Sequence, residues 1–162
     1  MAAIIHAASE EQLGSARALI EEYAHSLGVD LEFQSFEREM AEFPGEYQPP
    51  SGCVLVAEAD DRIVGCVCLR QFEPGICEMK RLYVIPAYHG QGLGRALAQA
   101  VIIQARTMGY DRMRLDTLAG MHAARALYRS LGFQECSPYR LNPLPGASFM
   151  ELALQATLSP KR

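Results

Sequence analysis

Hydrophobic and polar positions form two kinds of pattern along the chain, one typical of strands and one typical of helices. Short apolar runs rich in β-branched residues predict strands, whereas apolar residues that recur every three or four positions predict amphipathic helices. The predicted strands cover residues 2–8, 53–60, 62–72, 76–84, 111–118, 133–137 and 148–154. The predicted helices cover residues 9–28, 31–43, 93–109 and 121–132. This order predicts an α/β or α+β fold in which helices cover a mixed sheet.

Local signals support the element boundaries. Ser9, with Gln12 three residues later, is typical of a helix start, and Gly28 and Gly109 follow the last periodic residues of two helices. The Asp60-Asp61 pair between two β-rich runs predicts a hairpin. The strand–helix–strand unit of 76–118 predicts a parallel pair of strands joined by a right-handed crossover.

The amino-acid composition is typical of a soluble globular protein. The chain has 162 residues, of which 49% are hydrophobic and 21% charged, which is typical of a single domain. The net charge of -4 gives no reason to expect binding to nucleic acid or to an anionic membrane. The N-terminus lacks the basic flank of a signal peptide, and no apolar run is long enough to span a bilayer. We therefore expect a cytoplasmic protein.

The cysteines indicate no disulfide framework and no metal site. Five are present, an odd number, and most lie in apolar runs that are predicted to be strands. Cys66 and Cys68 are separated by one residue, whereas zinc knuckles and redox motifs use two. We expect reduced, buried thiols.

Three alternate glycines, Gly90, Gly92 and Gly94, precede the long helix of 93–109. Glycine permits a positive φ and lets a ligand approach the main chain closely. Several N–H groups at a helix N-terminus form a concave site for an anion, and the helix dipole favours negative charge at the same place. Residues 90–95 are thus a candidate phosphate cradle, with the charge of Arg95 nearby.

The glycine spacing does not identify the ligand. The dinucleotide pattern G-x-G-x-x-G fails because Arg95 or Leu97 occupies its third glycine position. The P-loop pattern fails because Arg95 and Ala96, and not Lys followed by Ser or Thr, come after Gly94. On the residues alone, a tight turn without a ligand is as good an interpretation as a phosphate site.

Two longer segments carry a resemblance to a known family. The segment LYVIPAYHGQGLGRAL resembles the acetyl-CoA motif of the GCN5-related N-acetyltransferase (GNAT) superfamily, and ALYRSLGF at 126–133 is similar to a second element of that family. The resemblance covers nearly the whole chain, so that it implies one acetyltransferase domain over 1–162. It also implies a mostly antiparallel sheet of about seven strands with four flanking helices. His89 and Met121 depart from the usual family residues.

The resemblance implies that acetyl-CoA is the cosubstrate and that no metal is needed. The pyrophosphate is expected on the N–H groups of 90–95, and the pantetheine arm beside the strand 78–84, which must part from 111–118 to admit it. N–H groups near 82–84 are expected to polarise the thioester carbonyl. The expected cofactor-binding residues are Leu82, Tyr83, Val84, His89, Gly90, Gln91, Gly92, Leu93, Gly94 and Arg95.

The resemblance also assigns two catalytic roles. Glu78 is the first candidate for the base that takes a proton from the acceptor ammonium, and Tyr128 is the family-matched acid that protonates the leaving thiolate. Tyr139 and His122 are reserve candidates for the base. Glu78 as a salt-bridged strand residue and Tyr128 as a packed helix residue are the structural alternatives.

The expected function is transfer of an acetyl group from acetyl-CoA to a primary amine of a small molecule or peptide, directly and without a cysteine nucleophile. A non-catalytic acyl-CoA sensor or partner module of the same fold is the alternative. Glutamates in the second helix, at 37, 39 and 42, favour a cationic amine if that helix lines the acceptor pocket. A homodimer through the C-terminal strands is also expected from the resemblance.

Overall fold

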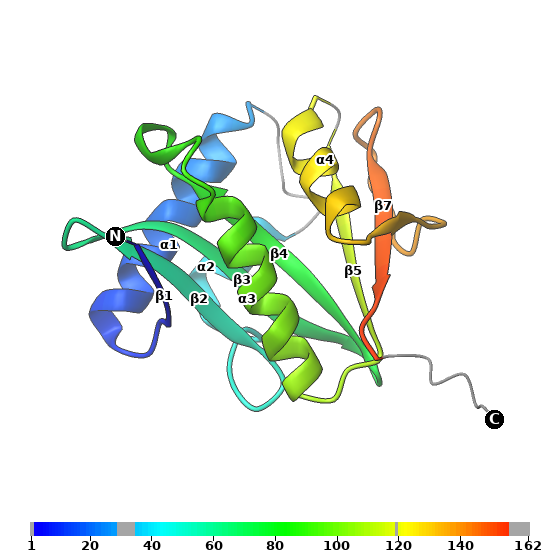
Figure 1. Cartoon of the computed structure of the whole chain (residues 1–162), viewed down its shortest axis with the longest axis horizontal. Helices are drawn as coiled ribbons and strands as arrows, with labels where there is room; N and C mark the ends of the chain where they lie inside the picture. The colour runs from blue at the N-terminus through cyan, green and yellow to red at the C-terminus, as the bar shows by residue number, and fades with distance from the viewer. Residues whose placement is uncertain (1, 29–34, 119, 156–162) are drawn as a thin grey trace.

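The described part of the chain contains one seven-stranded sheet (Figure 1). The computed structural model describes residues 2–28, 35–118 and 120–155. The strand order is β1-β2-β3-β4-β5-β7-β6, and every neighbouring pair is antiparallel except β4 and β5. The strands are β1 (Ala3–His6), β2 (Cys53–Ala59), β3 (Arg62–Glu73), β4 (Ile76–Val84), β5 (Arg112–Thr117), β6 (Gln134–Glu135) and β7 (Ser148–Ala153).

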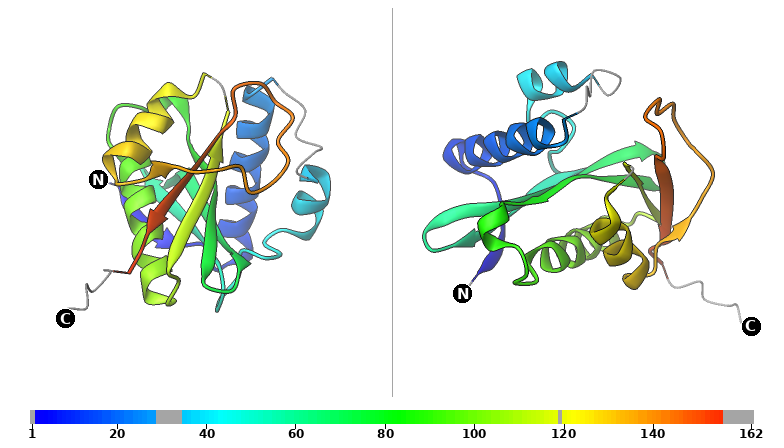
Figure 2. Two further views of the ribbon diagram at one scale, coloured as in Figure 1. Left: turned by 90° about the vertical axis from the view of Figure 1, so that its right-hand side faces the viewer. Right: turned by 90° about the horizontal axis from the view of Figure 1, so that it is seen from above.

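Among the described residues, four α-helices cover the two faces of this sheet. They are α1 (Glu10–Ser26), α2 (Phe36–Glu42), α3 (Leu93–Thr107) and α4 (His122–Ser130). Figure 2 shows α1 and α2 on one face and α3 and α4 on the other. The predicted fold class and element order are therefore confirmed. Of the predicted second helix, residues 31–34 lie outside the described residues, and a short 3₁₀ turn, Pro86–Tyr88, was not predicted.

The local signals in the sequence act as expected. Ser9 caps α1 by accepting a hydrogen bond from the Gln12 N–H, while the Gln12 side chain accepts from the Ser9 N–H. Asp60 and Asp61 both have positive φ angles, 52° and 59°, which is the geometry of a tight two-residue hairpin. These contacts fix where α1 begins and how β2 pairs with β3.

The apolar stripe of α3 anchors the face of the sheet on which the cofactor motif lies. Leu97, Val101 and Ala105 are fully buried, as their spacing predicts. The face of α3 that packs on the sheet also includes Ala98 and Ile102. Because α3 is held along its length, the glycine turn at its N-terminus is held next to the end of β4.

The parallel pair at the middle of the sheet is short. β4 and β5 pair over only three positions, from Ile76 with Arg112 to Glu78 with Arg114. β4 continues to Val84 and β5 to Thr117 without further pairing between them, whereas β5 stays paired with β7 throughout. The two strands therefore part, as the family resemblance implies for a pantetheine arm.

Four of the five cysteines are buried and all five are free thiols, as expected. Burial raises the pKa of Cys53 to about 11 and of Cys66 and Cys77 to about 12. Such thiols stay protonated and are poor nucleophiles at neutral pH. Within the described ranges, no helix has the length and hydropathy required to cross a bilayer.

Candidate active site

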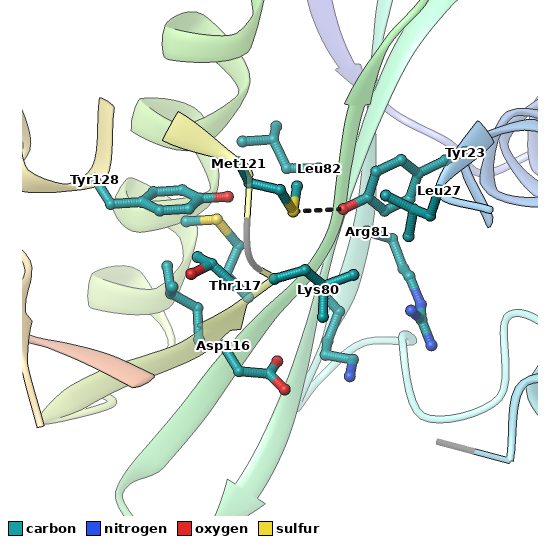
Figure 3. Close-up of a pocket in the computed structure, with 12 residues that line it drawn as sticks. Tyr23, Leu27, Lys80, Arg81, Leu82, Asp116, Thr117, Met121 and Tyr128 are labelled. Atoms are coloured by element: carbon teal, nitrogen blue, oxygen red, sulfur yellow. Dashed lines mark hydrogen bonds between the residues drawn. The ribbon is translucent and has the colours of Figure 1, made fainter. Parts of the chain in front are cut away.

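A narrow cleft lies where β4 and β5 part (Figure 3). Its walls come from β4, β5, the C-terminal end of α1, Met121 just before α4 and Tyr128 of α4, and its volume is about 50 Å³. The residues labelled in Figure 3 are Tyr23, Leu27, Lys80, Arg81, Leu82, Asp116, Thr117, Met121 and Tyr128. Segments far apart in the sequence thus bring two tyrosines, a lysine and an aspartate to one opening.

A β-bulge in β4 borders the cleft. Opposite β3, the register jumps from Lys80 paired with Cys68 to Tyr83 paired with Cys66. Arg81 lies within this jump with a φ of 62°, which is left-handed and uncommon for a residue with a side chain. A bulge leaves main-chain groups outside the ladder, so that the N–H groups of this stretch of β4 can turn toward a ligand in the cleft.

The glycine turn has the conformation that its sequence suggested. Gly90 and Gly92 have φ angles of 81° and 80°, and a Cβ built on either would meet no atom within 4 Å. Gly92 is the N-cap of α3, and no side chain caps this helix end. The first N–H groups of α3 are therefore open to a bound anion, and no side chain covers them.

A groove of about 510 Å³ connects this turn to the end of β4. Eight of the ten expected cofactor-binding residues line it, namely Leu82, Tyr83, Val84, His89, Gly90, Gly92, Leu93 and Gly94. Gln91 does not line it, and neither does Arg95, whose guanidinium donates to the Ser130 hydroxyl of α4 at 2.8 Å. Met121 and His122 line the opposite wall.

His89 departs from the family motif and contacts the main chain. Its Nε2–H donates to the Val84 carbonyl at 2.7 Å, which ties the glycine turn to the last residue of β4. The hydrogen bond gives His89 a positioning role in this structure. The sequence could not predict it, because the partner is a main-chain oxygen at the end of another element.

Met121 occupies the other departure from the family pattern and lies where the groove meets the cleft. It lines both openings, and its sulfur accepts a hydrogen bond from the Tyr23 hydroxyl at 3.9 Å. Figure 3 shows this contact crossing between α1 and the start of α4. Met121 and Tyr23 thus form the boundary between the groove and the cleft.

Tyr128, the expected acid, lies at the inner wall of the cleft. The residue is buried and packs edge to face against Phe133, with ring centroids 5.6 Å apart. Burial raises the pKa of Tyr128 well above its usual value, with smaller contributions from Tyr23 and Asp116. The hydroxyl makes no hydrogen bond to any described residue and, as Figure 3 shows, points into the opening. It is therefore a protonated group without a partner.

Glu78, the expected base, is the centre of an ion-pair cluster. Its side chain is fully buried and accepts from Arg70 at 2.8 and 3.0 Å and from Arg140 at 2.6 Å. The Tyr139 hydroxyl donates to its other oxygen at 3.0 Å. Burial opposes ionisation, but Lys80, Arg140 and Arg70 outweigh it, and the pKa of Glu78 is lowered. The structure thus brings Glu78 and the reserve candidate Tyr139 together, while His122 lines the groove beside the glycine turn.

The acidic second helix is less available than its sequence suggested. Glu39 forms a bidentate pair with Arg81, with distances of 2.7 and 3.0 Å, and Glu42 pairs with Arg38 along the helix. The Arg81 charge keeps the pKa of Glu39 low despite burial. Glu39 is therefore neutralised by the protein itself, which weakens the expectation that this helix selects a cationic amine.

The sequence reasoning considered Lys80 or Arg81 as an ion-pair partner of Glu78 and missed the actual partners, Arg70 and Arg140. Arg70, Lys80 and Arg140 all influence Glu78, and Arg114 shares the face through its register pairing with Glu78. The signal was present, because Arg70 and Lys80 interrupt runs that otherwise read as buried strands. Arg140 had no such signal, because it lies in the irregular segment between β6 and β7, which Figure 2 shows beside the sheet face that carries α1 and α2. Among the described residues, no group of His, Cys, Asp or Glu side chains is arranged to hold a metal.

Comparison with known proteins agrees with this geometry. Residues 14–133 match the model of the acetyltransferase (GNAT) family. An uncharacterised N-acetyltransferase of Schizosaccharomyces pombe is 40% identical over 146 residues, which cover 89% of this chain and 90% of that protein. The N-acetylaspartate synthetase of Rattus norvegicus is 34% identical over 110 residues, which cover 67% of this chain and 37% of that protein.

A solved structure shares the fold. The structure of yncA, a putative acetyltransferase from Salmonella typhimurium with its cofactor acetyl-CoA, has a TM-score of 0.69 at 23% identity and covers 98% of this chain and 97% of its own. The family match, the relatives and the fold lead to one conclusion: the chain belongs to the GNAT acetyltransferase family and is an acyltransferase.

Proposed function

We propose that this protein transfers an acetyl group from acetyl-CoA directly to a primary amine of a small molecule or peptide. One observation carries the proposal: a groove runs from an open helix N-terminus along the end of β4 to a cleft that contains an unpartnered tyrosine hydroxyl. The open helix N-terminus can bind a pyrophosphate at one end of the groove, and the unpaired stretch of β4 can pair with an amide-bearing arm.

The residues present fit acetyl-CoA. The N–H groups of 90–95 would hold the pyrophosphate, since Gly90 and Gly92 keep the turn free of side chains. The unpaired edge of β4 offers main-chain groups to the amides of the pantetheine arm. When bound, acetyl-CoA supplies an activated acyl group as a thioester. We assign the N–H groups of 82–84, next to the bulge, to polarise its carbonyl.

The neutral acceptor amine forms the new C–N bond as the C–S bond breaks. The departing sulfur takes up one proton and the nitrogen of the new amide releases one, so that the proton count is unchanged. We assign the donation of that proton to Tyr128, since its raised pKa keeps it protonated and its hydroxyl has no competing partner among the described residues. No thiol is needed as a nucleophile, which agrees with the buried, protonated cysteines.

The acceptor must first lose the proton of its ammonium group. We propose that Glu78 receives it through the Tyr139 hydroxyl, which already donates to Glu78 at 3.0 Å and has a lone pair to offer to an acceptor. Arg70 and Arg140 occupy the other oxygen of Glu78, so that direct contact between Glu78 and the acceptor requires their displacement.

The second candidate function is a non-catalytic acyl-CoA-binding module. An unpartnered Tyr128 hydroxyl favours the enzyme, since a binding module has no need of a buried donor at that position. The name of the N-acetylaspartate synthetases denotes the formation of a small acetylated amine, which favours a small acceptor over a peptide. A homodimer through the C-terminal strands remains a prediction.

Replacing Gly92 with alanine should weaken acetyl-CoA binding. A Cβ at a φ of 80° costs roughly 1–2 kcal/mol of strain and also narrows the cradle. Gly109→Ala is the matched control, since Gly109 has a φ of 90° at the other end of α3 and does not line the groove. Acetyl-CoA at 100 times its Kd should stabilise the wild type by about 2.7 kcal/mol. In thermal melts this shift should shrink in Gly92→Ala alone. Equal shifts in both variants would place the cradle elsewhere.

Tyr128→Phe should lower kcat by about 100-fold or more, since a positioned acid contributes that much. The assay is release of free thiol from acetyl-CoA in the presence of a panel of amines. Acetyl-CoA affinity and melting temperature should change little, because the hydroxyl has no partner to lose. Tyr110→Phe, which removes a hydrogen bond to the Ser51 carbonyl away from the cleft, should keep its turnover. Unchanged turnover in Tyr128→Phe would show that Tyr128 is not the acid. If the wild type releases no thiol with any amine of the panel, the non-catalytic binding module is favoured.

Glu78→Gln should abolish the acidic limb of the pH dependence of kcat/KM. The pKa of Glu78 is below its usual value of 4.5, so that the carboxylate can accept a proton above that pH and loses this capacity as the pH falls through the lowered value. The variant should be slow at every pH. Glu151→Gln, which breaks pairs with Arg112 and Arg114 on the neighbouring strand β5, should keep the limb. If the limb persists in Glu78→Gln, the base is another group.

A further inference from the structure

Lys80 is a buried cation in the cleft without a counter-ion in contact. It projects from β4 on the face that also carries Glu78, and only 6% of its surface is exposed. Its ammonium makes no hydrogen bond or ion pair with any described residue, although it lines the cleft at the parting of β4 and β5 (Figure 3). A buried ammonium is costly unless an anion is nearby.

The acids around Lys80 are engaged by other groups. Glu78 accepts from Arg70, Arg140 and Tyr139, and Glu39 is paired with Arg81. Asp116 accepts from the Asn142 amide at 3.1 Å and is not within ion-pair distance of Lys80. Burial lowers the pKa of Lys80 to about 8 although Glu78 opposes the shift, so that most molecules still carry the charge at pH 7.

Arg140 adds a second positive charge beside Glu78. One terminal nitrogen donates to Glu78, but its Nε is buried and has no hydrogen-bond partner. Its guanidinium lies over the rings of Phe72 and Tyr139, at 5.7 and 5.3 Å from their centroids, and Arg140 does not line the cleft. Lys80 does line the cleft, and because a buried ammonium is costly without an anion, its position indicates that an acceptor group enters from outside.

We propose that Lys80 holds a carboxylate of the acceptor, so that the acceptor class is a small amino acid whose amine and carboxylate are a few bonds apart. A carboxylate oxygen accepts a charge-assisted hydrogen bond from the Lys80 ammonium, which has no other acceptor among the described residues. The proposal rests on the acetyltransferase function proposed above and narrows it. Polyamines and aminoglycosides are disfavoured, since a polycation would meet Lys80 with like charge.

The first experiment compares matched acceptors on the wild type and on a charge-removing variant. L-Aspartate, L-alanine and β-alanine are each assayed with acetyl-CoA against their carboxamides, which keep the amine and lose the negative charge. The acids should exceed the amides in kcat/KM by tenfold or more, mainly through KM. Lys80→Gln should bring the ratio near one, Lys80→Arg should retain part of it, and Arg38→Gln, an exposed cation on α2, should leave it unchanged.

If the wild type has the same kcat/KM for the amides as for the acids, the proposal is overturned without any variant. An acid-to-amide ratio of kcat/KM that is unchanged in a folded Lys80→Gln variant would also overturn it. Either result with active enzyme leaves the proposed function standing. If no amine is acetylated, calorimetry with succinate against succinamide, in the presence of CoA, tests the subsite alone. Succinate binding that is lost in Lys80→Gln would support a carboxylate subsite, and equal or absent binding of both probes would reject it.

Discussion

The parting of β4 and β5 after the pair formed by Glu78 and Arg114 is the constraint on which the site depends. A parallel pair that continued to Val84 would satisfy the main chain of β4 and leave no edge for a ligand. Because β5 remains paired with β7, the opening is held from one side by an intact ladder. The bulge at Arg81 lies in the part of β4 that does not pair with β5. In the same stretch the register of β4 against β3 is shifted.

Ion pairs and hydrogen bonds hold the elements around this opening in place. Glu78 lies at the last paired position of β4. Its carboxylate accepts hydrogen bonds from Arg70 of β3 and from Tyr139 and Arg140 of the segment after β6. On the other side of the cleft, Glu39 of α2 and Arg81 neutralise each other. Buried charges of this kind stabilise little by themselves, since desolvation offsets attraction, but they specify geometry by penalising any arrangement that leaves one unpaired. Within the described ranges, the Lys80 ammonium has no ion pair or hydrogen bond to this network.

Most of the fold could be predicted from the sequence because its signals are local. Ser9 with Gln12, the Asp60-Asp61 turn and the stripe through Leu97, Val101 and Ala105 each encode an element without knowledge of the rest. The glycine turn was predicted for the same reason. Residues whose roles depend on register were not: the left-handed Arg81, the contact from His89 to the Val84 carbonyl and the Nε of Arg140 arise only once distant strands and loops are assembled. For Arg95, the local motif suggested a contact that the structure does not have: a phosphate contact was expected, but the guanidinium donates to the Ser130 hydroxyl.

A crystal structure of the protein with acetyl-CoA would test the central claim most directly, namely that the parted strands and the glycine turn form one cosubstrate site. The expected result has the pyrophosphate on the N–H groups of 90–95, the arm hydrogen bonded to the free edge of β4, and the sulfur within reach of the Tyr128 hydroxyl. Acetyl-CoA bound at another surface, or a β4 that pairs with β5 beyond Glu78 when it is bound, would contradict that claim.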